Sequence, residues 1–206
     1  MNKKQTSTIS KMLIVLSVSF GIRLFFSCNT PDPIDFHYNQ LSVTGIDNSG
    51  QYINKYDTVN TMYSEAIALQ LSLTDTSMYY TASLYHSVIE ALALPSVHAF
   101  SPVESFTPFH KVTAIQITTV LDLNETLKSG DNVTEHFLYA EDSFDLYHSL
   151  EKGISFLNGT QAYPTSSITV ILKPQIENTL AQFEVSITLD NGHTLFYTTE
   201  TFSIIK

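Results

Sequence analysis

Alternation of apolar and polar side chains near the C-terminus restricts that part of the chain to β-structure. The alternation runs along two segments between residues 183 and 199, separated by Asp190-Asn191-Gly192-His193. A period of two gives each strand one face to bury, and Asn191-Gly192 is a preferred pair for a two-residue type I′ turn. We therefore predict a β-hairpin. Its inward-facing residues are Phe183, Val185, Ile187, Leu189, Leu195, Tyr197 and Thr199.

Further segments have the same β-forming character. They cover residues 36–43, 64–73, 112–121, 167–172 and 202–205, and the last of them is expected to extend the second strand of the hairpin. Several short strands separated by turn residues are typical of two packed sheets. The predicted fold class is therefore all-β: an immunoglobulin-like β-sandwich with one or two short helical insertions, in a single domain over residues 35–206.

Two segments predict the helical insertions. Residues 81–94 repeat apolar side chains at four-residue spacing and stop before Pro95. The second helix is expected to begin at Asp142 or Ser143 and to end at Gly153 as a left-handed cap. The stretch 97–109, which contains two prolines, predicts a loop.

The N-terminal residues 1–27 have the layout of a secretory signal. Lys3, Lys4 and Lys11 precede an apolar run over 12–22, which is too short for a membrane span. Ser27 is a small residue directly before Cys28, the only cysteine of the chain. This order predicts a bacterial lipoprotein signal with cleavage before Cys28 and lipidation of its thiol, although Phe25 and Phe26 depart from the usual residues upstream of the cut.

Residues 28–34 predict a short tether between the lipid and the domain. Pro31 and Pro33 disfavour helix and keep this segment extended. Asn29 directly after the cysteine favours sorting to the outer membrane, with either its periplasmic or its surface face as the location. A membrane partner is therefore expected through the lipid anchor.

The charge of the mature chain excludes one class of partner. Removal of residues 1–27 leaves six basic residues against 20 acidic ones, a formal net charge of −14. A strongly acidic surface repels phosphate backbones, so no nucleic acid partner is expected.

Residues that could take part in catalysis or metal binding are scattered along the sequence. Seven histidines occur without the short spacing of a zinc site, and no serine-nucleophile motif or phosphate-binding glycine loop is present. We expect no cofactor, no metal and no catalytic residue. The candidates considered were Glu135-His136, Asp145 near His148, the oxygen-rich turns 47–50 and 122–125, and a stacking platform of Tyr79, Tyr80 and Tyr85.

Residues 112–137 carry a family resemblance. They read Val-Thr-Ala-Ile-Gln-Ile-Thr-Thr at 112–119, Asp-Leu-Asn at 122–124, a Ser-Gly-Asp turn from residue 129, and Phe137. This text, with the closing segment 182–201, resembles a family of uncharacterised Bacteroidota cell-envelope lipoproteins of about 200 residues. Leu123 stands where that pattern has phenylalanine. The resemblance implies an envelope lipoprotein with a domain of unknown function, and it supplies no catalytic residues.

Three functions are compatible with this sequence. The first is a non-enzymatic, lipid-anchored module that binds an envelope protein or a glycan. The alternative is an exported hydrolase that acts on glycan or peptide through paired carboxylates, and a third is a structural role. A hydrolase requires a concave site with converging carboxylates, whereas a binding module requires an exposed aromatic or apolar patch.

Overall fold

The computed structural model describes residues 32–48, 54–77, 105–141 and 146–206. The signal segment expected over 1–27, Cys28, the helix expected over 81–94 and the tyrosines at 79, 80 and 85 lie outside the described residues. Asp145 and the proposed helix start at Asp142 or Ser143 lie outside them as well.

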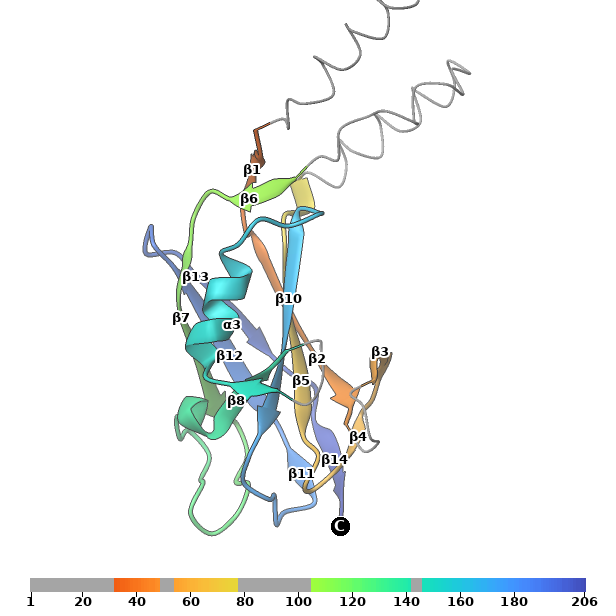
Figure 1. Cartoon of the computed structure of the whole chain (residues 1–206). Coiled ribbons are helices and arrows are strands. Elements are labelled where there is room, and N and C mark those ends of the chain that lie inside the picture. The colour runs from red at the N-terminus through yellow and green to blue at the C-terminus, as the bar shows by residue number, and fades with distance from the viewer. Residues whose placement is uncertain (1–31, 49–53, 78–104, 142–145) are drawn as a thin grey trace, which may run out of the picture.

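Two antiparallel sheets form the body of the domain (Figure 1). The larger has the strand order β3-β2-β5-β10-β8-β9, and the smaller has the order β13-β12-β7. The strands of the larger sheet are β2 (Gln40–Asp47), β3 (Asn54–Thr58), β5 (Ala68–Thr74), β8 (Phe137–Ala140), β9 (Tyr147–His148) and β10 (Thr165–Leu172). Those of the smaller sheet are β7 (Val112–Thr119), β12 (Phe183–Leu189) and β13 (Thr194–Thr198).

Small sheets close the two ends of this body (Figure 1). At one end β1 (Ile34–Phe36) pairs in parallel with β6 (Phe106–Pro108). At the other end β14 (Phe202–Ile205) lies between β11 (Leu180–Ala181) and β4 (Thr61–Tyr63).

The apolar core lies between the two main sheets. Leu71 on β5 is opposite both Val43 on β2 and Ile168 on β10, and all three are buried. An edge-to-face contact joins the sheets, with the rings of Phe137 and Phe183 5.7 Å apart. The mainly β sandwich and the inward faces predicted for 64–73 and 167–172 are therefore confirmed.

The hairpin is confirmed, but its turn differs from the prediction. The Gly192 N–H donates to the Leu189 carbonyl, and the Leu189 N–H donates to the His193 carbonyl. This pattern encloses three loop residues, with Gly192 at φ 81° as the left-handed residue. It corresponds to a type I turn followed by a glycine bulge, which also suits strand twist. The prediction of a two-residue type I′ turn was therefore wrong.

The second helix lies closer to the C-terminus than the sequence predicted. Helix α3 spans Leu150–Leu157, with Ser149 at its N-cap, and Tyr147 belongs to strand β9. Gly153 lies inside the helix and is buried, so it is not the C-terminal cap. A Cβ at Gly153 would lie 3.2 Å from both Ile168 Cδ1 and Tyr139 Cγ. The glycine therefore permits close approach of the helix to the sheet.

The last strand also departs from the prediction. Strand β14 leaves the hairpin and joins a different sheet, where Ser203 is in register with Thr61 in parallel and with Leu180 in antiparallel orientation. Phe202 and Ile204 are buried there. The alternation in this segment was recognised correctly, but alternation does not specify the neighbouring strand.

Helix α3 closes one open side of the sandwich. It contacts β7 of the smaller sheet and β8, β9 and β10 of the larger one. Its C-terminal residue Leu157 is fully buried, and the Tyr38 hydroxyl donates to the Leu157 carbonyl at 2.6 Å. This bond satisfies a terminal helix carbonyl inside the core. Burial raises the pKa of Tyr38 to about 12.

We predict that Tyr38→Phe lowers the stability of the domain at neutral pH by about 1–2 kcal/mol, because it removes the partner of a buried carbonyl. The unfolded chain releases the tyrosine proton near pH 10, whereas the native state keeps it to about pH 12. Wild type should therefore lose about 2–3 kcal/mol between pH 10 and 12 that the variant does not lose.

Urea unfolding measured from pH 7 to pH 12 tests this expectation. Tyr63→Phe is the matched control because the Tyr63 side chain is half-exposed on β4. Equal loss of stability in wild type and Tyr38→Phe over this range would contradict the assignment.

Candidate functional site

The junction of β8, β9 and α3 brings together charged side chains that are separate in the sequence. Tyr139 and Ala140 on β8 pair with His148 and Tyr147 on β9, and the chain enters α3 directly after β9. Glu141 follows β8, and its N–H donates to the Leu146 carbonyl. This short antiparallel pair places Glu141 beside the first turn of the helix.

Three polar groups converge at this junction. Lys152 Nζ donates to Glu141 Oε2 at 2.6 Å, and His148 Nε2 lies 2.9 Å from the same oxygen. Lys152 Nζ is also 2.9 Å from His148 Nε2. The hydrogen bond from Lys152 lowers the pKa of Glu141, with smaller contributions from the Lys152 charge and from His148. The carboxylate is thus held ionised by its neighbours.

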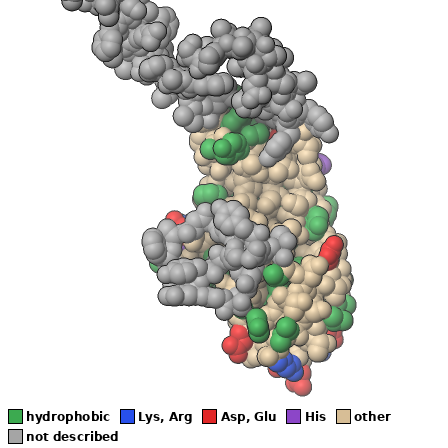
Figure 2. Space-filling view, turned by 90° about the vertical axis from the view of Figure 1, so that its right-hand side faces the viewer, with side chains coloured by type: hydrophobic (Ala, Val, Ile, Leu, Met, Phe, Trp, Pro, Cys, Tyr) green, Lys and Arg blue, Asp and Glu red, His purple; other side chains and the backbone are tan. Residues whose placement is uncertain are grey.

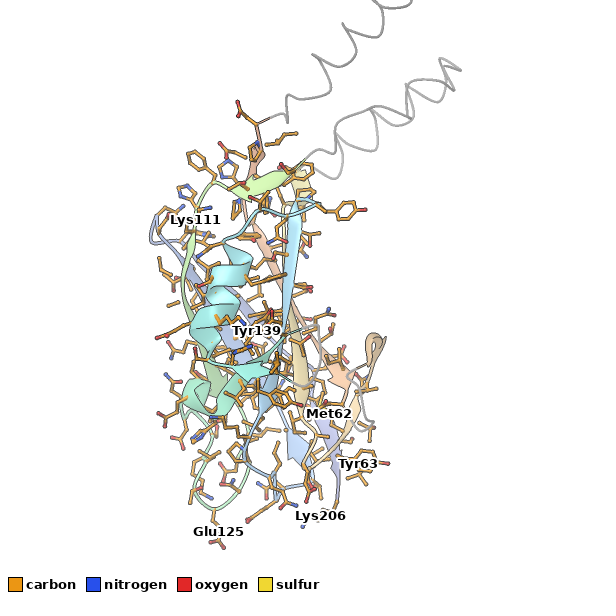
Figure 3. The ribbon with its side chains drawn as sticks, viewed as in Figure 1. Met62, Tyr63, Lys111, Glu125, Tyr139 and Lys206 are labelled. Atoms are coloured by element: carbon orange, nitrogen blue, oxygen red, sulfur yellow. The ribbon has the colours of Figure 1, made fainter. Side chains whose placement is uncertain are left out.

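Exposed apolar side chains occur on the same elements as this polar cluster. Leu146, Tyr147 and Phe156 have exposed fractions between 43% and 52%. The ring of Tyr139 lies 6.4 Å from that of His148 and 6.3 Å from that of Phe156, and Figure 3 labels Tyr139 beside the helix. Burial, then the charge of Glu141, raises the pKa of Tyr139. We call this surface the α3 face: Glu141, Leu146, Tyr147, His148, Lys152 and Phe156.

A groove of about 640 Å³ adjoins the α3 face at the start of the helix. Glu135 and Glu151 both line it, together with Lys173. Hydrolysis by a carboxyl pair depends on one carboxyl being shielded from water. The Glu135 side chain is 84% exposed, so the groove does not provide that shielding on this side.

The histidine pairs considered from the sequence have different outcomes. His148 is paired with Glu141, whereas its proposed neighbour Asp145 lies outside the described residues. His136 Nε2 is 3.9 Å from Glu135 Oε1, which makes a weak surface pair. Glu141 and Lys152 were missed, although the four-residue spacing of His148 and Lys152 was a usable signal.

The other described histidines lie away from the α3 face. His110 Nδ1 is 2.9 Å from Asp190 Oδ1, and the ring of His37 is 5.9 Å from that of His110. A backbone hydrogen bond from Lys111 is the main cause that lowers the pKa of Asp190. His193 belongs to the hairpin turn. Among the described residues, no group of three or more His, Cys, Asp or Glu side chains is placed to hold a metal ion.

The oxygen-rich segment 122–125 forms a turn. The Asp122 carboxylate accepts the Ser129 N–H, which is the main cause of its lowered pKa. Asn124 Oδ1 accepts the N–H groups of Thr126 and Leu127, and Leu123 is fully buried. These oxygens are used by the backbone, as expected for Asp and Asn in turns.

No helix within the described ranges is long and apolar enough to cross a membrane. No family model matches the chain, and no curated protein matches it. It is similar to a solved structure named BspA_C_mut, with 8% identity, and to the C-terminal domain of the Streptococcus pyogenes antigen I/II-family protein AspA, with 7% identity. Each match has a TM-score of 0.26 and covers 81% of this chain and 46% of the other, so the chain spans about half the length of either structure.

We predict that Lys152→Met raises the pKa of Glu141 towards its ordinary value, because the hydrogen bond from Lys152 is the main cause that lowers it. A lowered carboxyl pKa stabilises the native state above the pKa of the unfolded chain, and this contribution is lost as the pH falls through the native value. The variant should therefore lack the part of its stability at neutral pH that the lowered Glu141 pKa provides in wild type.

Titration of the side-chain carboxyl carbons by NMR measures this change directly. Lys128→Met is the control, since Lys128 Nζ contacts Asp122 at 3.4 Å and not Glu141. An unchanged Glu141 titration in Lys152→Met would show that the lysine does not hold the carboxylate.

Proposed function

We propose that this chain is a lipid-anchored protein of the bacterial cell envelope whose domain binds another envelope protein through the α3 face, without catalysing a reaction. The single observation that carries the binding role is the α3 face itself. It combines three exposed apolar side chains with a polar cluster whose members are fixed by one another. Exposed apolar patches with polar surroundings are typical of protein interfaces.

The apolar residues of this face would supply the binding energy. Leu146, Tyr147 and Phe156 would lose water-exposed area on contact, which is worth roughly 25 cal/mol per Å² before the costs of association. Tyrosine is also among the side chains that dominate binding energy at interfaces. The cluster of Glu141, His148 and Lys152 would fix the orientation of the partner.

A protein partner fits this surface better than a glycan does. Sugar binding requires polar groups that are free to bond to hydroxyls, whereas Glu141, His148 and Lys152 are already bonded to one another. The chain contains no tryptophan for stacking on sugar rings. A hydrolase working through paired carboxylates has less support, because Glu135 lies in open solvent at the groove.

The envelope location is supported by the sequence. A charged start, a short apolar run and Ser27-Cys28 are the parts of a lipoprotein signal. Asn29 after the cysteine supports the outer membrane as the destination. The anchor would hold the acidic domain outside the cytoplasm, where its partner would also reside.

We predict that the protein purified from its native host has the intact mass of a chain that begins at an acylated Cys28. Cys28→Ala should be released from the membrane fraction or remain unprocessed, because the thiol that accepts the lipid is absent. An unmodified chain cut at another position and found free would overturn the anchor.

We predict that a photo-crosslinking residue at position 147 captures one envelope protein in living cells of the host. Phe156→Ala in the same chain should abolish this adduct, because it removes another exposed apolar side chain of the α3 face. The measurement is the adduct on a denaturing gel, identified by mass spectrometry.

Phe196→Ala is the matched control, because Phe196 is an exposed aromatic residue on β13, in the sheet opposite β9. It should leave the adduct at position 147 intact. An adduct that contains glycan without protein would overturn the partner class, and the absence of any adduct would overturn the binding role of the α3 face.

A further inference from the structure

The domain is elongated along its strands (Figure 1). Strand β1, where the described chain begins, lies at one end, and β4, β14 and the C-terminus lie at the other (Figure 1). Figure 2 shows hydrophobic side chains at the end beside β1, and at the opposite end it shows acidic and basic side chains together with further hydrophobic ones.

Three apolar side chains are exposed at this end. The exposed fraction is 37% for Ile34 on β1, 55% for Phe109 after β6 and 69% for Tyr163 before β10. The Phe109 ring lies 5.0 Å from that of His37 and 4.8 Å from that of His110. We call Ile34, Phe109 and Tyr163 the apolar end of the domain.

Backbone pairing holds these three residues on a rigid base. The Ile34 N–H donates to the Ser105 carbonyl, and the Phe109 N–H donates to the Phe36 carbonyl, both at 2.8 Å. On the other side of β6, Phe106 and Gln161 exchange two hydrogen bonds. Strand β6 thus connects β1 to the segment that carries Tyr163 through backbone hydrogen bonds.

We propose that the apolar end is a membrane-contact surface that rests on the lipid headgroups beside the anchor. This inference rests on the proposed lipid anchor at Cys28, and it adds the orientation of the domain and the residues that touch the bilayer. The occupant of the surface is the bilayer itself.

The length of the tether supports this occupant. Five residues lie between Cys28 and Ile34, and the six steps from one Cα atom to the other span at most about 20 Å when fully extended. The tether enters the domain at Ile34, which is itself one of the three exposed residues. The apolar end is therefore the part of the domain that the anchor keeps nearest to the bilayer.

The chemistry of the exposed residues supports it as well. Tyrosine and phenylalanine suit the boundary between headgroups and acyl chains, where a ring meets both apolar and polar surroundings. Asp32 and Asp35 are also exposed near this end, so a zwitterionic lipid surface fits better than an anionic one.

Charge at the far end favours the same orientation. The loop that holds Asp122, Glu125 and Asp131 lies at the end opposite β1, and Figure 3 labels Glu125 there. The carboxylates of this loop stay hydrated when the loop points away from the bilayer, which avoids the cost of removing charges from water. The domain would therefore present its apolar end inward and its acidic loop outward.

The chain offers a direct test because it contains no tryptophan. Phe109→Trp and Tyr163→Trp each introduce a single fluorophore into the apolar end, and Tyr63→Trp is the matched control at the far end, where Figure 3 labels Tyr63. Each full-length variant is expressed in the native host, checked for acylation by intact mass, and reconstituted into phosphatidylcholine vesicles that contain brominated phosphatidylcholine.

We expect bromine to quench the fluorescence at positions 109 and 163 and to shift both emission maxima to the blue, with no change at position 63. Acylated, vesicle-bound variants without quenching at 109 and 163 would overturn the membrane contact while the anchor stands. Equal quenching at all three positions would also overturn it, because the domain would then have no fixed orientation. Unacylated protein that fails to join the vesicles would overturn the anchor and this inference together.

Discussion

The packing of helix α3 against the open side of the sandwich is the contact on which the rest of the structure depends. Gly153 brings the helix close to Ile168 and Tyr139, and Leu157 is fully buried at its end. The same position of the helix places Lys152 beside Glu141 and His148. One packing arrangement therefore completes the core and assembles the α3 face, so a change at the helix–sheet contact would affect both.

The polar cluster of the α3 face contributes differently from the core. Its side chains are partly exposed, with Glu141 36% and Lys152 48% accessible, and ion pairs in that position add little to stability. The bond from Tyr38 to the Leu157 carbonyl is enclosed, so its loss leaves a buried acceptor unsatisfied. The cluster thus fixes the geometry of a surface, whereas the buried bond holds the helix in place.

Two different small sheets close the ends of the domain. Strands β1 and β6 pair in parallel where the proposed tether would enter, while β4, β11 and β14 close the opposite end. The α3 face lies along the side of the sandwich between them (Figure 1). If the β1 end contacts the bilayer as proposed, the α3 face is left accessible to a partner beside the membrane.

The sequence by itself determined the mainly β class, the hairpin at 183–198 and the inward faces of β5 and β10, because a strand's period of two is a local property. It also indicated that Asp122 and Asn124 form a turn. Tertiary structure decided the rest. Gly153 looked like a helix cap because glycine favours that position, but close packing against Ile168 and Tyr139 placed it inside the helix. Strand β14 left the hairpin because alternation specifies a buried face and not a neighbour. Glu141 joined His148 and Lys152 through the β8–β9 pairing, and such a meeting is set by the packing of separate elements and not by spacing along the chain.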